Sequence, residues 1–188
     1  MATRSHRRRS SSPAVRLARS VESASVLDPV VRAINPAAQA LIGSEGRRRL
    51  LQGDWLGHAV HPLMTDLPIG FWTSATVLDL VGSEQSRPGA RKLVGLGVLS
   101  AVPTAITGWA EWASVSRPQE RRVGVVHAVS NAAAIAAYAA SWRARARGEH
   151  ARGRNLALVG AAVASAGGFL GGHLVSARKV SSRNAEFD

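Results

Sequence analysis

The sequence predicts an all-α integral membrane protein: a four-helix up-and-down bundle with short N-terminal juxtamembrane helices. Four apolar segments lie within residues 58–177, and each is close to the ~20 residues that a helix needs to cross a bilayer. Short polar loops join them, so neighbouring helices should be antiparallel. Three histidines, His61, His127 and His173, then fall at one end of the bundle.

The N-terminal part of the chain is basic and poor in apolar residues. The formal net charge is +12, from 24 Lys+Arg against 12 Asp+Glu, and much of the Arg and Ser precedes residue 50. Residues 1–26 are predicted to be a disordered basic tail, because they have too little apolar surface to offset the entropy lost on ordering. The arginines lack interleaved aromatic residues, so nucleic acid is not an expected partner. Residues 178–188 are predicted to be a polar tail.

Residues 27–57 are predicted to form an amphipathic juxtamembrane segment. Val30, Val31, Ile34, Ala38 and Leu41 recur at roughly helical spacing, interrupted by a proline. The run Arg47-Arg48-Arg49 suits lipid head groups and Trp55 suits the boundary of the hydrocarbon. A pair of soluble helices is the alternative.

The four predicted transmembrane helices cover residues 62–81, 93–110, 123–142 and 155–177. Their mean hydropathy is modest, because Ala and Gly dominate the last two. A soluble bundle would need a polar face on every helix, however, and residues 93–110 carry no charge. Gly167, Gly168, Gly171 and Gly172 form small-xxx-small pairs of the kind that allows close packing in membranes.

These features lead us to expect the lipid bilayer as a partner and a multi-pass location in the inner (cytoplasmic) membrane. The positively charged residues are almost balanced between the two ends of the bundle, and the basic tail favours cytoplasmic termini. Self-association into a homo-oligomer is compatible with the sequence.

The residues that could carry chemistry gather where the first predicted helix begins. His61 is there, the third helix leaves from this end with His127, and the fourth returns to it with His173. Further side chains expected at the same end are His58, Asp66, Trp109, Glu111 and Asn131. Ionisable groups within membrane helices usually face the interior, so Asp66 and Glu111 are expected to pair with or orient the imidazoles.

Two cofactors fit this set of residues. A b-type haem with two axial histidines needs imidazoles facing each other, which diagonal helices provide; His61 and His127 are the best pair, with His58 and His173 as reserves or propionate partners. Alternatively, several histidines with Asp66 hold a divalent metal. The structural alternative is that the polar cluster only joins the helices, as in an assembly protein without a cofactor.

Several short strings of residues resemble one bacterial family. The strings are Trp55–Leu63, Asp66–Trp72, Thr107-Gly108-Trp109, Arg122-Val123-Gly124 followed by His127 and Asn131, and Gly171–Val175. In this order they are similar to a four-helix transmembrane domain known as domain of unknown function family 2231, over about residues 27–176. The family's first motif usually reads Gly-His-Pro-x-His-Pro; Ala59 replaces the first proline here, while both histidines are present.

The resemblance also implies a redox setting. The family domain occurs N-terminal to Rieske iron–sulfur domains, which makes membrane electron transfer and a separate redox protein the implied function and partner. This sequence has no cysteine for such a cluster. It shows no nucleophile–base pair and no glycine-rich phosphate loop, so we do not expect a catalytic motif of its own.

Overall fold

The computed structural model describes residues 12–181, and this part of the chain consists of helices and their connecting turns. The predicted all-α class is confirmed. The α-helices are α1 (Pro13–Ser23), α2 (Asp28–Leu41), α3 (Glu45–Gln52), α4 (Val60–Val81), α5 (Arg87–Ala113), α6 (Pro118–Ala146) and α7 (His150–Gly172). A π-helical turn, His173–Ala177, continues α7. Three short 3₁₀ turns cover Ser25–Leu27, Asp54–Leu56 and Glu84–Ser86.

Helix α1 corrects the prediction of disorder for residues 13–26; residues 1–11 lie outside the described part. Ser12 caps the helix by accepting a hydrogen bond from the Val15 amide, and Pro13 occupies its first turn, where no amide donor is lost. The helix is held from outside, because Arg122 of α6 donates to the Glu22 carbonyl at 2.8 Å. A polar composition therefore does not prevent order when another helix supplies the contacts.

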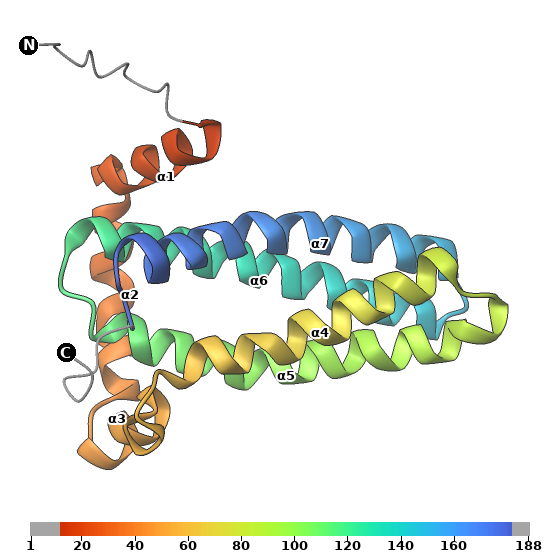
Figure 1. Cartoon of the computed structure of the whole chain (residues 1–188), viewed down its shortest axis with the longest axis horizontal. Helices are drawn as coiled ribbons and strands as arrows, with labels where there is room; N and C mark the ends of the chain where they lie inside the picture. Colours follow the sequence, from red (N-terminus) through yellow and green to blue (C-terminus); the bar gives the residue numbers. More distant parts are fainter. Residues whose placement is uncertain (1–11, 182–188) are drawn as a thin grey trace, which may run out of the picture.

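Helix α2 crosses one end of the long helices (Figure 1). It continues through Pro36, where an interruption is predicted. Val31 and Ala38 of α2 are buried against Trp112 and Val125. Gln39 donates to the Ala113 carbonyl at 2.7 Å, and so satisfies an acceptor at the C-terminus of α5 that would otherwise lack a partner.

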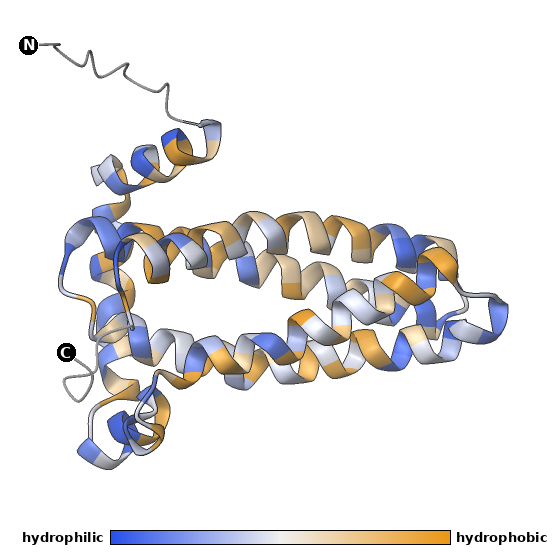
Figure 2. Ribbon diagram, in the orientation of Figure 1, coloured by the Kyte–Doolittle hydropathy of each residue, from blue (hydrophilic) through white to orange (hydrophobic). Residues whose placement is uncertain are grey.

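Helices α4, α5, α6 and α7 lie side by side, and each packs against two of the others (Figure 1). Within residues 12–181, three helical segments are long and apolar enough to cross a membrane: Glu84–Ala113, Pro118–Ala146 and His150–Ala177. Helix α4, which contains Asp66 and Asp79, is not among them. Figure 2 shows the hydrophilic residues of the long helices mainly at their two ends.

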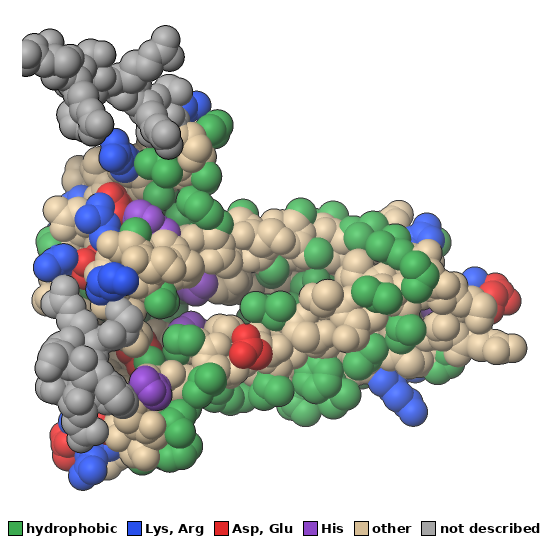
Figure 3. All heavy atoms as spheres, viewed as in Figure 1, with side chains coloured by type: hydrophobic (Ala, Val, Ile, Leu, Met, Phe, Trp, Pro, Cys, Tyr) green, Lys and Arg blue, Asp and Glu red, His purple; other side chains and the backbone are tan. Residues whose placement is uncertain are grey.

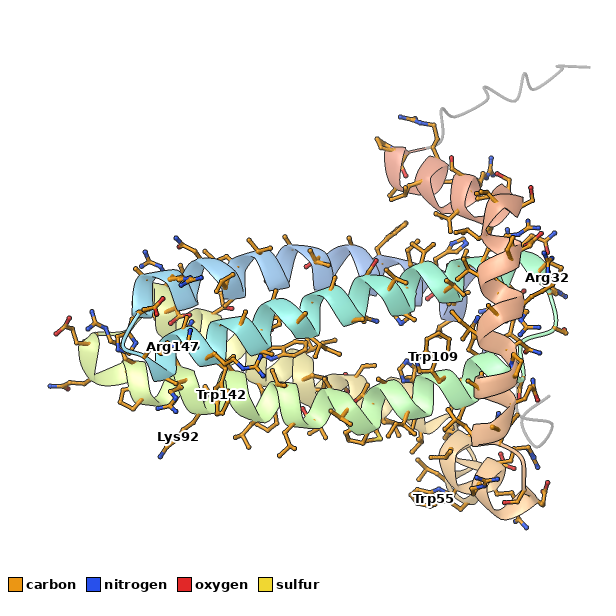
Figure 4. All side chains as sticks on the ribbon, turned by 180° about the vertical axis from the view of Figure 1, so that it is seen from behind. Arg32, Trp55, Lys92, Trp109, Trp142 and Arg147 are labelled. Atoms are coloured by element: carbon orange, nitrogen blue, oxygen red, sulfur yellow. The ribbon has the colours of Figure 1, made fainter. Side chains whose placement is uncertain are left out.

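Aromatic and basic side chains mark both ends of the long helices. Figure 4 shows Trp109 and Trp55 toward the end that α2 crosses, and Trp142, Lys92 and Arg147 toward the opposite end. Trp55 and Trp142 are exposed. Exposed tryptophans beside cations at two levels are typical of a protein whose middle lies in a bilayer.

The α4–α5 and α6–α7 hairpins repeat the same contacts. Trp72 follows His61 by 11 positions in α4, and Tyr138 follows His127 by 11 positions in α6. Gly97 and Gly108 of α5 receive Trp72 and His61, while Gly160 and Gly171 of α7 receive Tyr138 and His127. Each of these glycines lets an aromatic ring lie directly on the neighbouring helix, because a Cβ there would collide with the ring. The two hairpins are therefore approximate structural repeats.

Candidate functional site

The candidate site is the place where the two hairpins present corresponding histidines to each other. The ring centroids of His61 on α4 and His127 on α6 are 6.4 Å apart, with the ring planes at 85°. The two helices are diagonal, since α4 packs mainly on α5 and α6 mainly on α7. Figure 3 shows histidine side chains on both sides of the opening between the upper and lower pairs of helices. The structure thus brings together the two histidines predicted to be the best pair.

Main-chain carbonyl groups orient both imidazoles. Nδ1 of His61 lies 3.0 Å from the Thr104 carbonyl oxygen, and Nδ1 of His127 lies 2.7 Å from that of Gly167. A carbonyl oxygen can only accept, so each Nδ1 carries the proton and each Nε2 is left as the nitrogen with a lone pair. These acceptors occupy equivalent places, four residues before Gly108 and four residues before Gly171.

The two Nε2 atoms differ in their present surroundings. The Asn131 side-chain amide lies 3.0 Å from Nε2 of His127 and donates to it. The structure describes no hydrogen bond to Nε2 of His61. The other ring nitrogen, Nδ1, lies 3.4 Å from the Thr107 hydroxyl oxygen. The pair therefore offers one open nitrogen and one that an amide side chain holds.

Close packing against glycine sets the position of each ring. A Cβ at Gly171 would lie 2.8 Å from Cε1 of His127, and a Cβ at Gly108 would lie 2.8 Å from Cε1 of His61. Both distances are shorter than van der Waals contact, so a larger residue must push the imidazole away from its place.

We therefore expect Gly171→Ala to lower the free energy of unfolding by about 1–3 kcal/mol, the usual cost of overpacking. The matched control is Gly168→Ala on the same helix, where a Cβ meets nothing within 4 Å. That substitution should stabilise the protein by roughly 0.4–1 kcal/mol, because it restricts the unfolded chain. Thermal unfolding of both variants in the same detergent provides the comparison, and equal shifts would show that the ring is not tightly seated.

Two more side-chain pairs follow the histidines along the interior. Trp72 and Tyr138 stack with centroids 4.0 Å apart and planes at 6°. Beyond them Arg145 donates two hydrogen bonds to Asp79, at 2.8 and 2.5 Å, and the side chains are 1% and 9% exposed. Each pair joins equivalent positions of α4 and α6. From the histidines toward the end of the bundle opposite α2, the interior is therefore filled first by an aromatic pair and then by a buried ion pair.

The expected carboxylate partners do not orient the histidine pair. The side chain of Asp66 is exposed on α4. Glu111 accepts a hydrogen bond from Ser181 at 2.5 Å through one oxygen, and its other oxygen is buried without a hydrogen-bond partner. For Asp66 the physical reason is its position on the helix: five residues after His61, it lies about 7 Å further along α4 and about 140° around it, on an exposed face.

The remaining predicted residues have other environments. Nε2 of His173 lies 2.7 Å from a carboxylate oxygen of Glu22 in α1, so His173 is not part of the His61–His127 pair. Trp109 packs edge-to-face on Trp112, with centroids 5.4 Å apart. His58 is exposed in the turn before α4. Only Asn131, among the predicted supporting residues, contacts one of the two central imidazoles.

Glu22 connects α1 to the end of α7. Hydrogen bonding from the Arg178 guanidinium holds the pKa of Glu22 below its ordinary value of 4.5; burial opposes this effect and His173 adds to it. A carboxyl group whose pKa is lowered by folding stabilises the folded state above its ordinary pKa. This stabilisation is lost as the pH falls through the lowered value.

We therefore expect α1 to detach reversibly in acid, beginning below about pH 4.5. Hydrogen exchange of residues 13–23, expressed as protection factors corrected for the intrinsic rate, should show the loss. Glu22→Gln should lower protection at pH 7 and remove the pH dependence. Protection that stays constant from pH 7 to pH 3 in the unmodified protein would contradict this role for Glu22.

The prediction from sequence missed several residues of the site. Thr104 and Gly167 act through their main chain, so their side-chain identities carry no signal. Gly108 and Gly171 each lie within a quoted family motif, but a glycine does not show which ring it will receive. The 11-residue interval shared by His61–Trp72 and His127–Tyr138 is the signal that could have revealed the repeat.

Within residues 12–181, no group of three or more His, Asp or Glu side chains is arranged to hold a metal ion. A family model described as "Predicted membrane protein (DUF2231)" matches residues 57–184. No curated protein and no solved structure matches the chain.

Proposed function

The chain belongs to the DUF2231 family of predicted membrane proteins, and on this premise we propose that it is a four-span membrane protein that binds haem b between its two hairpins and serves membrane electron transfer. The single observation that carries the proposal is the opposition of His61 and His127 on equivalent, diagonal helices. The resemblance to domains that accompany Rieske modules supports a redox role, with a separate redox protein as partner.

Helix α4 is proposed as the fourth span. Its 22 residues would extend about 33 Å, which matches the hydrocarbon thickness. Of its two carboxylates, Asp79 is neutralised by Arg145 in the interior, where ionisable groups of membrane helices belong. Asp66 is exposed about 9 Å along the helix from its first residue, in the part of the span nearer to that end.

The two imidazoles fit a haem better than they fit a divalent metal. His61 and His127, whose ring centroids are 6.4 Å apart, would be the two residues that hold the haem iron. Two histidines are sufficient for that role. A divalent metal would need further protein ligands.

The protein's own contribution would be to hold the two rings and tune their basicity. A haem bound here supplies reversible one-electron transfer. The Thr104 and Gly167 carbonyls fix the tautomer that leaves Nε2 free and increase its electron density. Asn131 must release Nε2 of His127 before that nitrogen can ligate. The Trp72–Tyr138 stack would keep water from entering the site from the end of the bundle opposite α2.

The direct test is purification of the full chain in a mild detergent, with haem supplied during expression. A reduced-minus-oxidised spectrum with a low-spin α-band, one haem per chain by pyridine haemochrome, and no stoichiometric divalent metal are expected. A purified, folded protein without a Soret band would refute the proposal, whether or not it holds a divalent metal.

The second candidate function is structural, with no cofactor. The observation that favours it is that His127 already has partners for both ring nitrogens and packs on Gly171. Under this alternative, His127→Ala would lower the thermal stability of a protein that shows no chromophore before or after the substitution.

For topology we propose the inner (cytoplasmic) membrane with both termini in the cytoplasm, supported by the basic residues before α1. The chain contains no cysteine, so single substitutions can be labelled without background. In intact spheroplasts, Arg147→Cys should react with an impermeant maleimide and Ser12→Cys should not. The reverse pattern would invert the topology.

A further inference from the structure

Residues of helix α1 and of the end of α7 line an open cleft. Its volume is about 550 Å³. Val15 of α1 faces Phe169, Gly172 and Ala177 across it, so most of the wall is apolar. Val15 and Phe169 are 41% and 39% exposed, so apolar surface remains uncovered along the outside of α7. This wall could accept an acyl chain.

The polar end of the cleft is positively charged. Arg19, Arg178, His173 and Glu22 line it. The two oxygens of Glu22 are used by Arg178 and His173. The structure describes no carboxylate paired with the exposed guanidinium of Arg19. Two guanidinium groups and one carboxylate therefore line this end, and the unmatched cation is the exposed Arg19 of α1.

From this arrangement we infer that the cleft between α1 and α7 binds an anionic phospholipid, with the headgroup phosphate at Arg19 and an acyl chain along Val15 and Phe169. A phosphate matches the paired donors of a guanidinium. An uncharged amphiphile such as a quinone would gain less here, because both oxygens of Glu22 and Nε2 of His173 already form hydrogen bonds.

The site is an addition to the family domain. Helix α1 lies before residues 57–184, which the family model matches, so one wall of the cleft comes from outside the shared domain. The inference is independent of haem binding at His61 and His127, because a lipid at α1 needs only the outer surface of α7. It does require the chain to lie in a bilayer.

The test measures lipid binding to the full chain in a non-ionic detergent by native mass spectrometry. The probes are 1-palmitoyl-2-oleoyl phosphatidylglycerol, the corresponding phosphatidylcholine, and glycerol 1-phosphate, which has the anion without the chains. Phosphatidylglycerol should bind at least fivefold more tightly than phosphatidylcholine, because one arginine near a membrane surface contributes about a factor of five. Glycerol 1-phosphate alone should not compete.

Two matched pairs of variants localise the effect. Arg19→Gln should remove the preference for phosphatidylglycerol, while Arg16→Gln, with the same change of charge on the same helix but outside the cleft, should keep it. Gly172→Leu should fill the cleft and weaken both lipids. Gly168→Leu is its control: a Cβ meets nothing within 4 Å at either glycine, so both variants should fold.

The inference is overturned if phosphatidylglycerol and phosphatidylcholine bind equally, or if Arg19→Gln and Arg16→Gln give the same loss, which would indicate a diffuse charge effect. Unchanged binding in Gly172→Leu would exclude the cleft. Displacement of the lipid by an equimolar short-chain ubiquinone would identify the cleft as a quinone site instead.

Discussion

Replacing either His61 or His127 with alanine is expected to abolish the low-spin haem spectrum. Under the proposed function each ring would supply one of the two haem ligands; the ring centroids are 6.4 Å apart. Removing a group that only hydrogen-bonds to a metal's ligand typically lowers the affinity for the metal roughly 10–100-fold. Removing a ligand itself should lower the affinity for haem at least as much. Pyridine haemochrome on each purified variant should therefore give less than about a tenth of the haem per chain found in the unmodified protein.

Three control variants separate ligation from a general loss of structure. His58→Ala removes an exposed histidine from the same motif, and His173→Ala removes one that lies on Glu22; both should retain haem. Asn131→Ala should retain it as well, or increase occupancy, because the amide competes for Nε2 of His127. Equal haem loss in His58→Ala and His61→Ala would show that the pair is not the ligand set.

The largest effect on stability is expected from Arg145→Met. The guanidinium is 1% exposed and Asp79 is 9% exposed, so the substitution leaves a buried carboxylate without its partner. Breaking such a pair from one side typically costs about 3–5 kcal/mol. Thermal unfolding in detergent should show a large fall in the midpoint, and Asp79→Leu alone should produce a similar fall.

The double variant Asp79→Leu with Arg145→Met tests whether the unpaired buried charge causes this loss of stability. A buried ion pair replaced by apolar residues of similar size is often neutral or stabilising, so the double variant should recover most of the stability lost by either single variant. Haem binding should be unaffected, because the Trp72–Tyr138 layer separates this pair from the histidines. An additive loss in the double variant would mean that packing, rather than the unpaired charge, determines the cost.

The four long helices, and the depth of His61 and His127 along two of them, could be predicted from the sequence alone, whereas α1 could not. The spacing of apolar and charged residues predicted four membrane-spanning helices. Three of them are long and apolar enough to cross a membrane, and α4 is the fourth long helix beside them. Because a helix rises by about 1.5 Å per residue, the distance of His61 and His127 from their helix ends follows from their numbers alone. The common level of these two histidines, and their pairing across diagonal helices, could therefore be anticipated.

The packing of the helices against one another determines which face of each helix turns inward and which groups its side chains contact. Five residues after His61, Asp66 lies about 7 Å further along α4 and about 140° around it, so the two side chains cannot share a face. Packing placed His61 toward His127 and left Asp66 exposed. The rotation of a helix about its axis is set by what the neighbouring helix allows, and here Gly108 and Gly171 provide the space for the two rings. The same dependence on neighbours explains α1, which is ordered by Arg122 and Arg178 on other helices. The position of a residue along its helix therefore follows from the sequence of that helix, whereas the face that turns inward depends on the helices packed against it.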